Sequence, residues 1–533
     1  MHVVIKIGLL LDSRQVPVWQ QHIVSFIRNN PSFTLQLVVL NDAHGARASH
    51  NVVYRIVRKI DRAIFRARHD CFVRVNVSEV LKGVEVVRTT PIRSTFTDGI
   101  PEEDLAIIRG KGVDLFIRFG FRILKGDILN VARFGVWSLH HGDSAVSRGG
   151  PPAFWEVINK EPVTGVTLQV LSSDLDGGAV IKKAFVKTDR TSFNRNQNAL
   201  YWASIELFCS SLQELAVKET VSSENQLRFY SKPLYRNPGN AKAFFIFFGF
   251  WARRLQEVLH TMINKQQWSL YYQIRQGQYE TSLFRYKKIT PPAGADWADP
   301  FVIYKDKTYF VFFEEFIRAN KKAHISIIEF DQGGKLKSQK PVQVLTEPHH
   351  LSYPFVFENA GTYYMIPESA GSLSVWIYKC ERFPDQWKKH IELLAGIALY
   401  DPTLHLHNKT WYLFGTEKPF EGNSPDQYLH VYFSDDLFSG SWKAHPQNPL
   451  TRDVRGARPA GRIFEHDGKL LRPAQIGAPK YGYGIRFQEI VKLTPEEYEE
   501  RPFDDILPDW KEGLLATHTF NFVDGFSVVD GQM

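Results

Sequence analysis

Two histidines and a late aspartate stand out in the stretch SLHHGDSAVSRGGPPAFWEVINKEPVTGVTLQVLSSDLDGGAVI, which runs from Ser138 to Ile181. His140 and Asp176 each follow an apolar, strand-like run and precede a turn. Titratable groups at such strand ends are typical of α/β active sites. An imidazole titrates near neutrality, so His140 can relay a proton or stabilise a developing oxyanion, and Asp176 can orient the imidazole or accept a proton. The stretch therefore predicts an active site.

The same residues also have plainer explanations. A His-His-Gly-Asp turn can be a polar turn whose hydrogen bonds are all internal, or the remnant of a degenerate binding pocket. A metal site that uses both His140 and His141 is disfavoured, because neighbouring residues of an extended chain point to opposite faces. We therefore predict no metal here.

The stretch resembles the core of the folate-dependent formyltransferases, the group that contains methionyl-tRNA formyltransferase, glycinamide ribonucleotide formyltransferase and the sugar N-formyltransferases. The match has no gap, and the residues that carry it are Asp114, Leu115, Gly120, Ile123, Leu124, Gly135, His140, Arg148, Gly149, Pro152, Trp155, Thr164, Gly165, Val166, Thr167, Leu175, Asp176 and Gly178. The resemblance implies 10-formyltetrahydrofolate as the cofactor, a pterin pocket near Phe119, Gly120 and Phe121, and attack of an amine on the formyl carbon.

Several positions depart from the family pattern or bear on the acceptor. Ser138 stands where the family has an asparagine that faces the formyl group, and loss of one oxyanion donor costs about 2.7–4 kcal/mol. Turnover then requires the Ser138 hydroxyl or His141 to donate instead. His141 and Asp143 add an imidazole and a carboxylate that are expected to read a different acceptor. Arg148 and Trp155, which match the family, are expected to contribute to the substrate site.

Length and composition indicate a globular protein of several domains. A chain of 533 residues exceeds one ordinary hydrophobic core, so two or three domains are expected. The formal charge is +8, and its basic residues concentrate between Arg55 and Arg68 at helical spacing. This cluster most simply predicts an amphipathic helix with a solvated basic face; binding to an anionic membrane is the secondary alternative, and no nucleic-acid partner is expected.

Cellular location is indicated by cysteine use and by apolar runs. The three cysteines Cys71, Cys209 and Cys380 are far apart in sequence, which favours a reducing, cytoplasmic setting. No apolar run reaches membrane-spanning length. The longest, Ala243–Trp251, is followed by Arg253 and Arg254 and predicts either a buried packing helix or an interfacial contact with a membrane.

The periodicity of the chain divides it into three regions. Strand-like and helical runs alternate from Lys6 to about Gln213, which predicts a Rossmann-like α/β domain over residues 1–215, with a parallel sheet flanked by helices. No GxGxxG follows the first strand, so a dinucleotide cofactor is not expected. Residues 216–266 are predicted to be a helical, aromatic linker, and residues 267–533 an all-β domain.

The second half contains an internal repeat. Pro300, Pro354 and Pro402 are each followed nine residues later by an aromatic residue, and a weaker copy starts at Arg458. Repeats of about 50 residues with a few strands each predict propeller blades. Pairing of Trp268–Ile274 with the final HTFN segment would close a fifth blade.

The repeats resemble the five-bladed propeller of family 43 glycoside hydrolases and the N-terminal region of plant glucosamine inositolphosphorylceramide transferases. The first resemblance implies acids in a central funnel. The equivalents offered by the repeat phase are Asp299, Glu315, Glu368, Asp401 and Glu417. Tyr353 and Gln475 interrupt this set, so a propeller that binds a carbohydrate is expected, and a purely structural role for the acids stays open.

Together, these patterns predict transfer of a formyl group to an amino sugar, linked to a nucleotide or a glycan, in surface polysaccharide biosynthesis. The alternative is a glycan-processing or glycosyl-transferring propeller joined to a degenerate formyltransferase-like scaffold. A binding module that uses both pockets is the third possibility.

Overall fold

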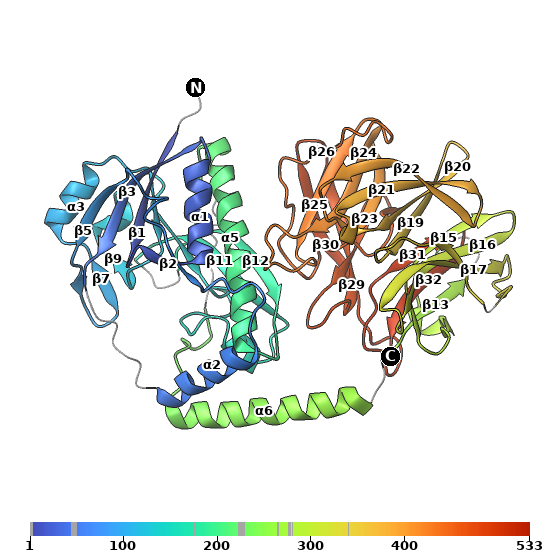
Figure 1. Ribbon diagram of the computed structural model, residues 1–533, viewed down its shortest axis with the longest axis horizontal. Coiled ribbons are helices and arrows are strands. Elements are labelled where there is room, and N and C mark those ends of the chain that lie inside the picture. Colours follow the sequence, from blue (N-terminus) through green and yellow to red (C-terminus); the bar gives the residue numbers. More distant parts are fainter. Residues whose placement is uncertain are drawn as a thin grey trace. The chain divides into compact units, whose positions relative to one another are not determined.

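The computed structural model describes residues 4–43, 51–173, 177–221, 230–263, 266–275, 279, 281–338 and 340–533. These residues divide into two compact units: Met1–Val258 with Phe420–Asn423, and Leu259–Pro419 with Ser424–Met533. Figure 1 shows a domain of helices and strands in the first half and a domain of strands in the second. Each is described by itself.

A twisted, mostly parallel sheet forms the centre of the first unit. Its strand order is β12-β11-β10-β8-β1-β3-β5, in which the pairs from β10 to β5 are parallel while β11 and β12 are antiparallel. The strands are β1 (Ile5–Leu11), β3 (Phe33–Asn41), β5 (Glu85–Thr89), β8 (Leu115–Arg118), β10 (Val136–His140), β11 (Val163–Val170) and β12 (Ala179–Lys187). The predicted alternation of strands and helices is confirmed.

Helices cover both faces of this sheet. Helices α1 (Val18–Asn29) and α5 (Phe193–Lys218) pack with β1 and β11 in one core, while α3 (Glu102–Arg109) packs against the other face with β3 and β8. The remaining elements before α5 are short or peripheral: β2 (Gln15–Pro17), α2 (Val52–Ile64), β4 (Arg74–Asn76), β6 (Ile92–Arg93), β7 (Thr97–Gly99), β9 (Ile123–Lys125), η1 (Asp127–Asn130) and α4 (Trp155–Ile158). The result is the Rossmann-like three-layer domain that the sequence predicts.

The segment predicted as a linker contains α6 (Asn240–Ile263). The division between the two units falls within this helix, after Val258, which lies inside the predicted linker of residues 216–266. Ala243, Phe247 and Phe250 are buried against Phe154 and Phe193 of the first unit. This half of α6 therefore packs with the α/β domain, as predicted by the buried alternative.

The described residues of the second half form five four-stranded antiparallel sheets, the blades of the predicted propeller. The last blade combines the final strands of the chain with the first strands of its second half. The direct partner of β13 is β32 rather than the HTFN segment, whose last two residues start β31. The blades are β15 (Ala295–Lys305), β16 (Thr308–Ile317), β17 (Lys322–Asp331), β18 (Val342–Leu345); β19 (Ser352–Asn359), β20 (Thr362–Glu368), β21 (Ser374–Arg382), β22 (Gln386–Ala395); β23 (Tyr400–His407), β24 (Thr410–Glu417), β25 (Tyr428–Ser434), β26 (Lys443–Ala444); β27 (Phe464–His466), β28 (Lys469–Ile476), β29 (Gly484–Leu493), β30 (Tyr498–Ile506); and β14 (Lys287–Ile289), β13 (Trp268–Ile274), β32 (Phe526–Gln532), β31 (Phe520–Val523).

Three blades begin with the same backbone irregularity. Asp299, Tyr353 and Asp401 each precede a proline, each has a positive φ, and each lies at a break in register between the first two strands of its blade. Aspartate tolerates this left-handed region, whereas it costs a tyrosine more. A β-bulge of this kind re-aims the side chain that it carries.

Candidate functional site

The end of β10 presents the serine and histidine that the sequence singled out. Ser138 and His140 are two residues apart on one strand, so their side chains lie on the same face. Arg118, the last residue of the neighbouring strand β8, donates from Nε to the Ser138 hydroxyl oxygen at 3.0 Å. The sequence reasoning missed Arg118, whose charge at a strand end was the available signal. The arrangement gathers a guanidinium, a hydroxyl and an imidazole at the carboxyl edge of the sheet.

His140 is held by the loop that follows it. Its Nε2 lies 2.8 Å from the carbonyl oxygen of Ser147, and only 9% of the residue is exposed. The carboxyl of Glu156 is also buried, and its Oε2 has no hydrogen-bond partner among the described residues. Burial raises the pKa of Glu156, and the charge of His140 works in the opposite direction. Glu156 was missed from the sequence, although a carboxylate within the apolar run AFWEVI signalled it.

His141 does not take the role expected of it. Its ring stacks on Tyr201 with centroids 3.7 Å apart, and it meets Trp19 edge to face. Burial, together with the charges of His140 and Arg118, lowers the pKa of His141 to about 3. The imidazole is therefore neutral and packed in the core. The expectation that it reads an acceptor is corrected, because the adjacent histidines point to opposite faces.

Asp143, Arg148 and Trp155 have partners within the loop and in neighbouring segments of the α/β domain. Asp143 accepts a backbone hydrogen bond from Ala145 at 3.0 Å and forms an ion pair with Lys183. Arg148 donates to the Ser144 carbonyl, and its guanidinium lies over the Tyr230 ring. Trp155 is 8% exposed and donates to the Gly150 carbonyl at 3.2 Å. These contacts hold the loop beside His140, and a contact with substrate stays a prediction.

The backbone amides of the segment predicted to bind the pterin are hydrogen-bonded to other groups of the protein. The amides of Phe119 and Gly120 donate to the Leu10 carbonyl, and that of Phe121 donates to Asp12 Oδ1 at 2.7 Å. A Cβ on Gly120 would lie 2.3 Å from the Asp12 amide, so only glycine fits this close approach. The Phe121 ring is buried in the core. The segment thus offers no unbonded backbone N–H to a pterin, and Asp176 lies outside the described residues.

The propeller contains a cavity of about 650 Å³ at its centre. Asp299 and Glu368 line it, as predicted, together with Glu314 and Arg458. Aromatic and imidazole side chains complete the wall: Trp268, Phe316, His350, Tyr400, Tyr481 and His518. Such a mixture of ring faces and convergent polar groups is typical of small-molecule sites.

Two of the predicted acids, Glu315 and Glu417, do not line the cavity, because the alignment of the repeats was displaced by one residue. The register pairs Glu314 with Ala298, Glu368 with Ser352, and Thr416 with Tyr400, so these three are the equivalent positions. Since strand side chains alternate between faces, a slip of one residue moves the side chain to the other face. The expected equivalence of Glu315 and Glu417 is therefore wrong.

Glu315 and Glu417 are instead tied within their blades. Glu315 accepts hydrogen bonds from Trp297 at 3.1 Å and from Ser326 at 2.7 Å. Glu417 accepts one from the Tyr432 hydroxyl at 2.6 Å. Both carboxylates thus have the structural role that the sequence analysis left open for the acids.

Arg458 is the charge centre of the cavity wall. Its guanidinium contacts Asp401 at 2.6 and 3.0 Å, Asp426 at 2.9 Å and Glu368 at 3.1 Å. Asp401 is fully buried behind this contact, and Gln475 donates to it at 2.8 Å. Asp401 therefore acts on the cavity through Arg458. The weaker repeat beginning at Arg458 was recognised in the sequence, but its charge was not.

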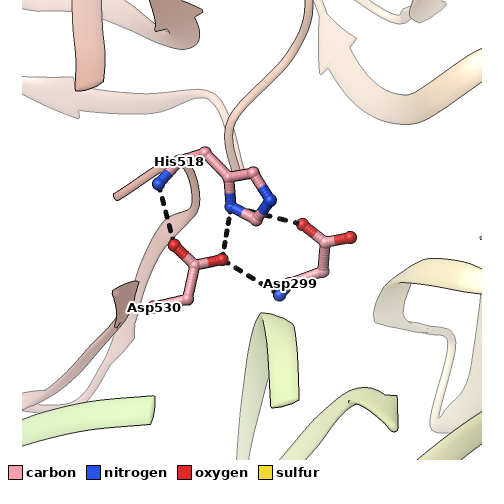
Figure 2. A group of neighbouring side chains, drawn as sticks. All are labelled: Asp299, His518 and Asp530. Atoms are coloured by element: carbon pink, nitrogen blue, oxygen red, sulfur yellow. Dashed lines mark hydrogen bonds and ion pairs between the residues drawn. The ribbon is translucent and has the colours of Figure 1, made fainter. Parts of the chain in front are cut away.

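A second cluster joins the first and last blades (Figure 2). His518 Nδ1 lies 2.5 Å from Asp530 and 3.9 Å from Asp299, and the Asp299 amide donates to Asp530 at 3.1 Å. The His518 ring stacks on Trp268 with centroids 4.3 Å apart. These three residues are close enough to share a metal ion, but the hydrogen bonds already pair them, so we describe an ion-pair network.

Burial and neighbouring charges shift the acidity of this cluster. Burial, only partly opposed by His518, raises the pKa of Asp299 to about 7. Burial also raises the pKa of Glu368 well above its ordinary value, against the pull of Arg458. The pKa of His518 would fall on burial alone, but Asp530 and Asp299 raise it to about 9. The cavity therefore holds a carboxyl, Asp299, that titrates near neutral pH beside a cationic imidazole.

Comparison with known proteins assigns different relatives to the two halves. The family described as glucosamine inositolphosphorylceramide transferase 1, N-terminal, matches residues 290–514. Glucosamine inositolphosphorylceramide transferase 1 of Oryza sativa subsp. japonica is 33% identical over 239 residues, which are 44% of this chain and 32% of that protein. Methionyl-tRNA formyltransferase of Prochlorococcus marinus (strain NATL2A) is 24% identical over 185 residues, which are 34% of this chain and 53% of the relative.

Both predicted sequence resemblances are confirmed. The chain spans about a third of the length of the first of these relatives and about half of the second. Among solved structures, an exo-beta-1,3-galactanase from Clostridium thermocellum is similar at 14% identity, over 46% of this chain and 62% of that one, with a TM-score of 0.34. Within the described residues, no helix is long and apolar enough to cross a membrane.

Proposed function

We propose that the chain is a transferase that acts on a saccharide. In this proposal the α/β domain transfers a formyl group from 10-formyltetrahydrofolate to the amino group of a sugar, and the propeller cavity binds the saccharide. The observation that carries the formyl-transfer step is the set of Arg118, Ser138 and His140 at the carboxyl edge of the sheet.

The hydrogen bond from Arg118 compensates in part for the missing asparagine. Because the guanidinium donates to the Ser138 oxygen, the serine keeps its own hydroxyl proton as a donor. In this proposal the hydroxyl donates to an oxygen on which negative charge develops, and the positive charge of Arg118 stabilises the same charge. His140 then relays the proton lost by the amine.

These donors fit the formyl end of the cofactor. When bound, 10-formyltetrahydrofolate supplies the formyl carbon. Ser138, His140 and Arg118 would hold its carbonyl group, whereas Phe119–Phe121 are not assigned to the pterin, since their amides are bonded inward.

The propeller supports a saccharide as the other substrate. Ring faces such as those of Trp268 and Tyr481 stack on the apolar faces of sugars, and Asp299 and Glu368 offer hydrogen bonds to hydroxyl or amino groups. The names of the propeller's relatives contain glucosamine, an amino sugar. We propose a sugar linked to a nucleotide or a glycan, in surface polysaccharide biosynthesis. The three unpaired cysteines favour a cytoplasmic setting.

The test is formyl transfer by the purified chain to nucleotide-linked and glycan-linked amino sugars, with 10-formyltetrahydrofolate as donor. We expect a formylated product by mass spectrometry, and a roughly 10²-fold or greater loss of rate in His140→Ala and Ser138→Ala. His390→Ala, an exposed histidine of the propeller, is the control. Absence of folate binding and of product with the wild-type chain would remove the formyl-transfer claim.

Glycosyl transfer or cleavage within the propeller is the second candidate, because Asp299 and Glu368 are buried in one cavity with raised pKa values. A carboxyl that is protonated near neutrality can act as a general acid. Processing of a glycan that is lost in Asp299→Asn but survives in His140→Ala would favour this candidate over formyl transfer.

A further inference from the structure

Two helices of the α/β domain expose rows of apolar side chains. In α2, Val52, Ile56, Ile60 and Ile64 recur every fourth residue, and each is about half exposed. In α6, Phe245 and Phe248 are 72% and 70% exposed. The exposed large apolar residues of α2 and of α6 as far as Leu255, which we call the α2–α6 surface, are Val52, Ile56, Ile60, Ile64, Phe244, Phe245, Phe248, Trp251 and Leu255.

The two helices lie side by side (Figure 1). Near their starts, the Val53 amide donates to Asn240 Oδ1 at 3.2 Å. Near the end of α2, the Phe65 ring stacks on Trp251 with centroids 6.1 Å apart. The helices therefore run in the same direction. The inner face of α6 is already buried, so the outer phenylalanines are not needed for packing.

Basic hollows border this surface along α2. One hollow of about 400 Å³ is lined by Arg58, Lys59, Arg62 and Arg74. A second, of about 500 Å³, is lined by Lys59, Arg62 and Arg66, with Asp70 as its acidic residue. The Asp70 carboxylate pairs with Arg62 at 2.7 Å, which leaves an excess of positive charge in both hollows.

The exposed apolar rows and the basic hollows together discriminate among possible binding partners. Nucleic acid would account for the basic hollows but not for exposed phenylalanines on the adjoining helix. A second copy of the chain would account for the apolar rows but would bring two basic regions together. A bilayer with anionic headgroups satisfies both features, since apolar side chains enter the headgroup boundary while Lys and Arg contact phosphates.

We infer that the α2–α6 surface docks the chain on a membrane that contains anionic phospholipids. The phenylalanines of α6 and the isoleucines of α2 insert at the interface, and the hollows around Lys59 and Arg62 receive lipid phosphate groups. Docking of this kind lies in the plane of the membrane and requires no spanning helix.

The experiment is flotation of the full chain with vesicles of phosphatidylcholine alone or with 30 mol% phosphatidylserine (roughly the anionic content that gives a strongly negative surface). Binding is expected only to the anionic vesicles. The triple variant Phe244→Ser, Phe245→Ser, Phe248→Ser should bind at least roughly tenfold more weakly. The charge-reversal variant Arg55→Glu, Lys59→Glu, Arg66→Glu should lose a similar factor.

Matched controls use equally exposed residues elsewhere. Phe96→Ser removes an apolar side chain that is 66% exposed, and Lys340→Glu with Lys388→Glu reverses exposed charges on the propeller. Both should bind like the wild type. Three outcomes would overturn the inference: no binding to anionic vesicles, an RNA affinity that survives the phenylalanine triple variant while vesicle binding is absent, or a dimer in sedimentation that this variant abolishes without any vesicle binding.

Discussion

Around the propeller cavity, single cationic side chains each neutralise several buried carboxylates. Arg458 contacts three carboxylates, and His518 lies between two more. Removing one member of such a buried group leaves the others without compensation, which usually costs more than the pair contributes. The cavity is therefore both a candidate ligand site and a set of coupled titrating groups.

Stability of the last blade should depend on pH through His518. Its pKa is about 9 in the folded chain, against 6.5 for an ordinary histidine, so its contribution is complete below pH 6.5 and is lost as the pH rises through 9. The shift corresponds to about 3 kcal/mol as an order of magnitude. Deprotonation of Asp299 near pH 7 acts in the same direction, because its pKa is also raised by folding.

Hydrogen exchange of the backbone amides in β31 and β32, corrected for intrinsic exchange rates, measures this loss of stability between pH 6.5 and 9. His518→Gln should flatten the dependence, while His390→Gln should keep it. An unchanged pH profile in His518→Gln would show that the imidazole carries no such charge.

At the scale of elements, the sequence predicted the strands and helices of the first half and the five blades, because periodicity and repeats report directly on burial. It failed where a single residue of register decides the outcome. Glu314 and Glu315 are adjacent acids on β16, so an error of one residue in aligning the repeats selects the side chain on the wrong face of the strand. It also missed Arg118 and Glu156, because a charge at a strand end or within an apolar run does not show which side chains it contacts.

Helix α6 offers a matched pair of substitutions. Phe247 is 4% exposed and packs in the cluster with Phe154, whereas Phe248, the next residue, faces outward. Phe247→Ala should lower the free energy of unfolding of the α/β domain by about 3–5 kcal/mol through loss of burial and a cavity. Phe248→Ala should change it by less than about 0.5 kcal/mol. Equal effects in urea denaturation would contradict the two-faced description of the helix.

At the scale of the whole molecule, the chain consists of two units with separate hydrophobic clusters. The α/β domain has its largest cluster between the sheet and α1 and α5, and the blades of the propeller pack on one another through their own clusters. A domain with its own core can unfold as its own cooperative unit. The chain should therefore show two thermal transitions.

Alanine substitutions of two matched leucines, one in each unit, assign each calorimetric transition to its unit. Leu212 in α5 and Leu413 in β24 are both fully buried, and truncation of either to alanine should cost about 2–5 kcal/mol. For units of this size, such a loss lowers Tm by roughly 4–15 °C. Leu212→Ala should shift only one transition and Leu413→Ala only the other, while an exposed change such as Val217→Ala moves neither. A single transition shifted by both variants would instead mean that the halves unfold together, because folding of each would then depend on the other.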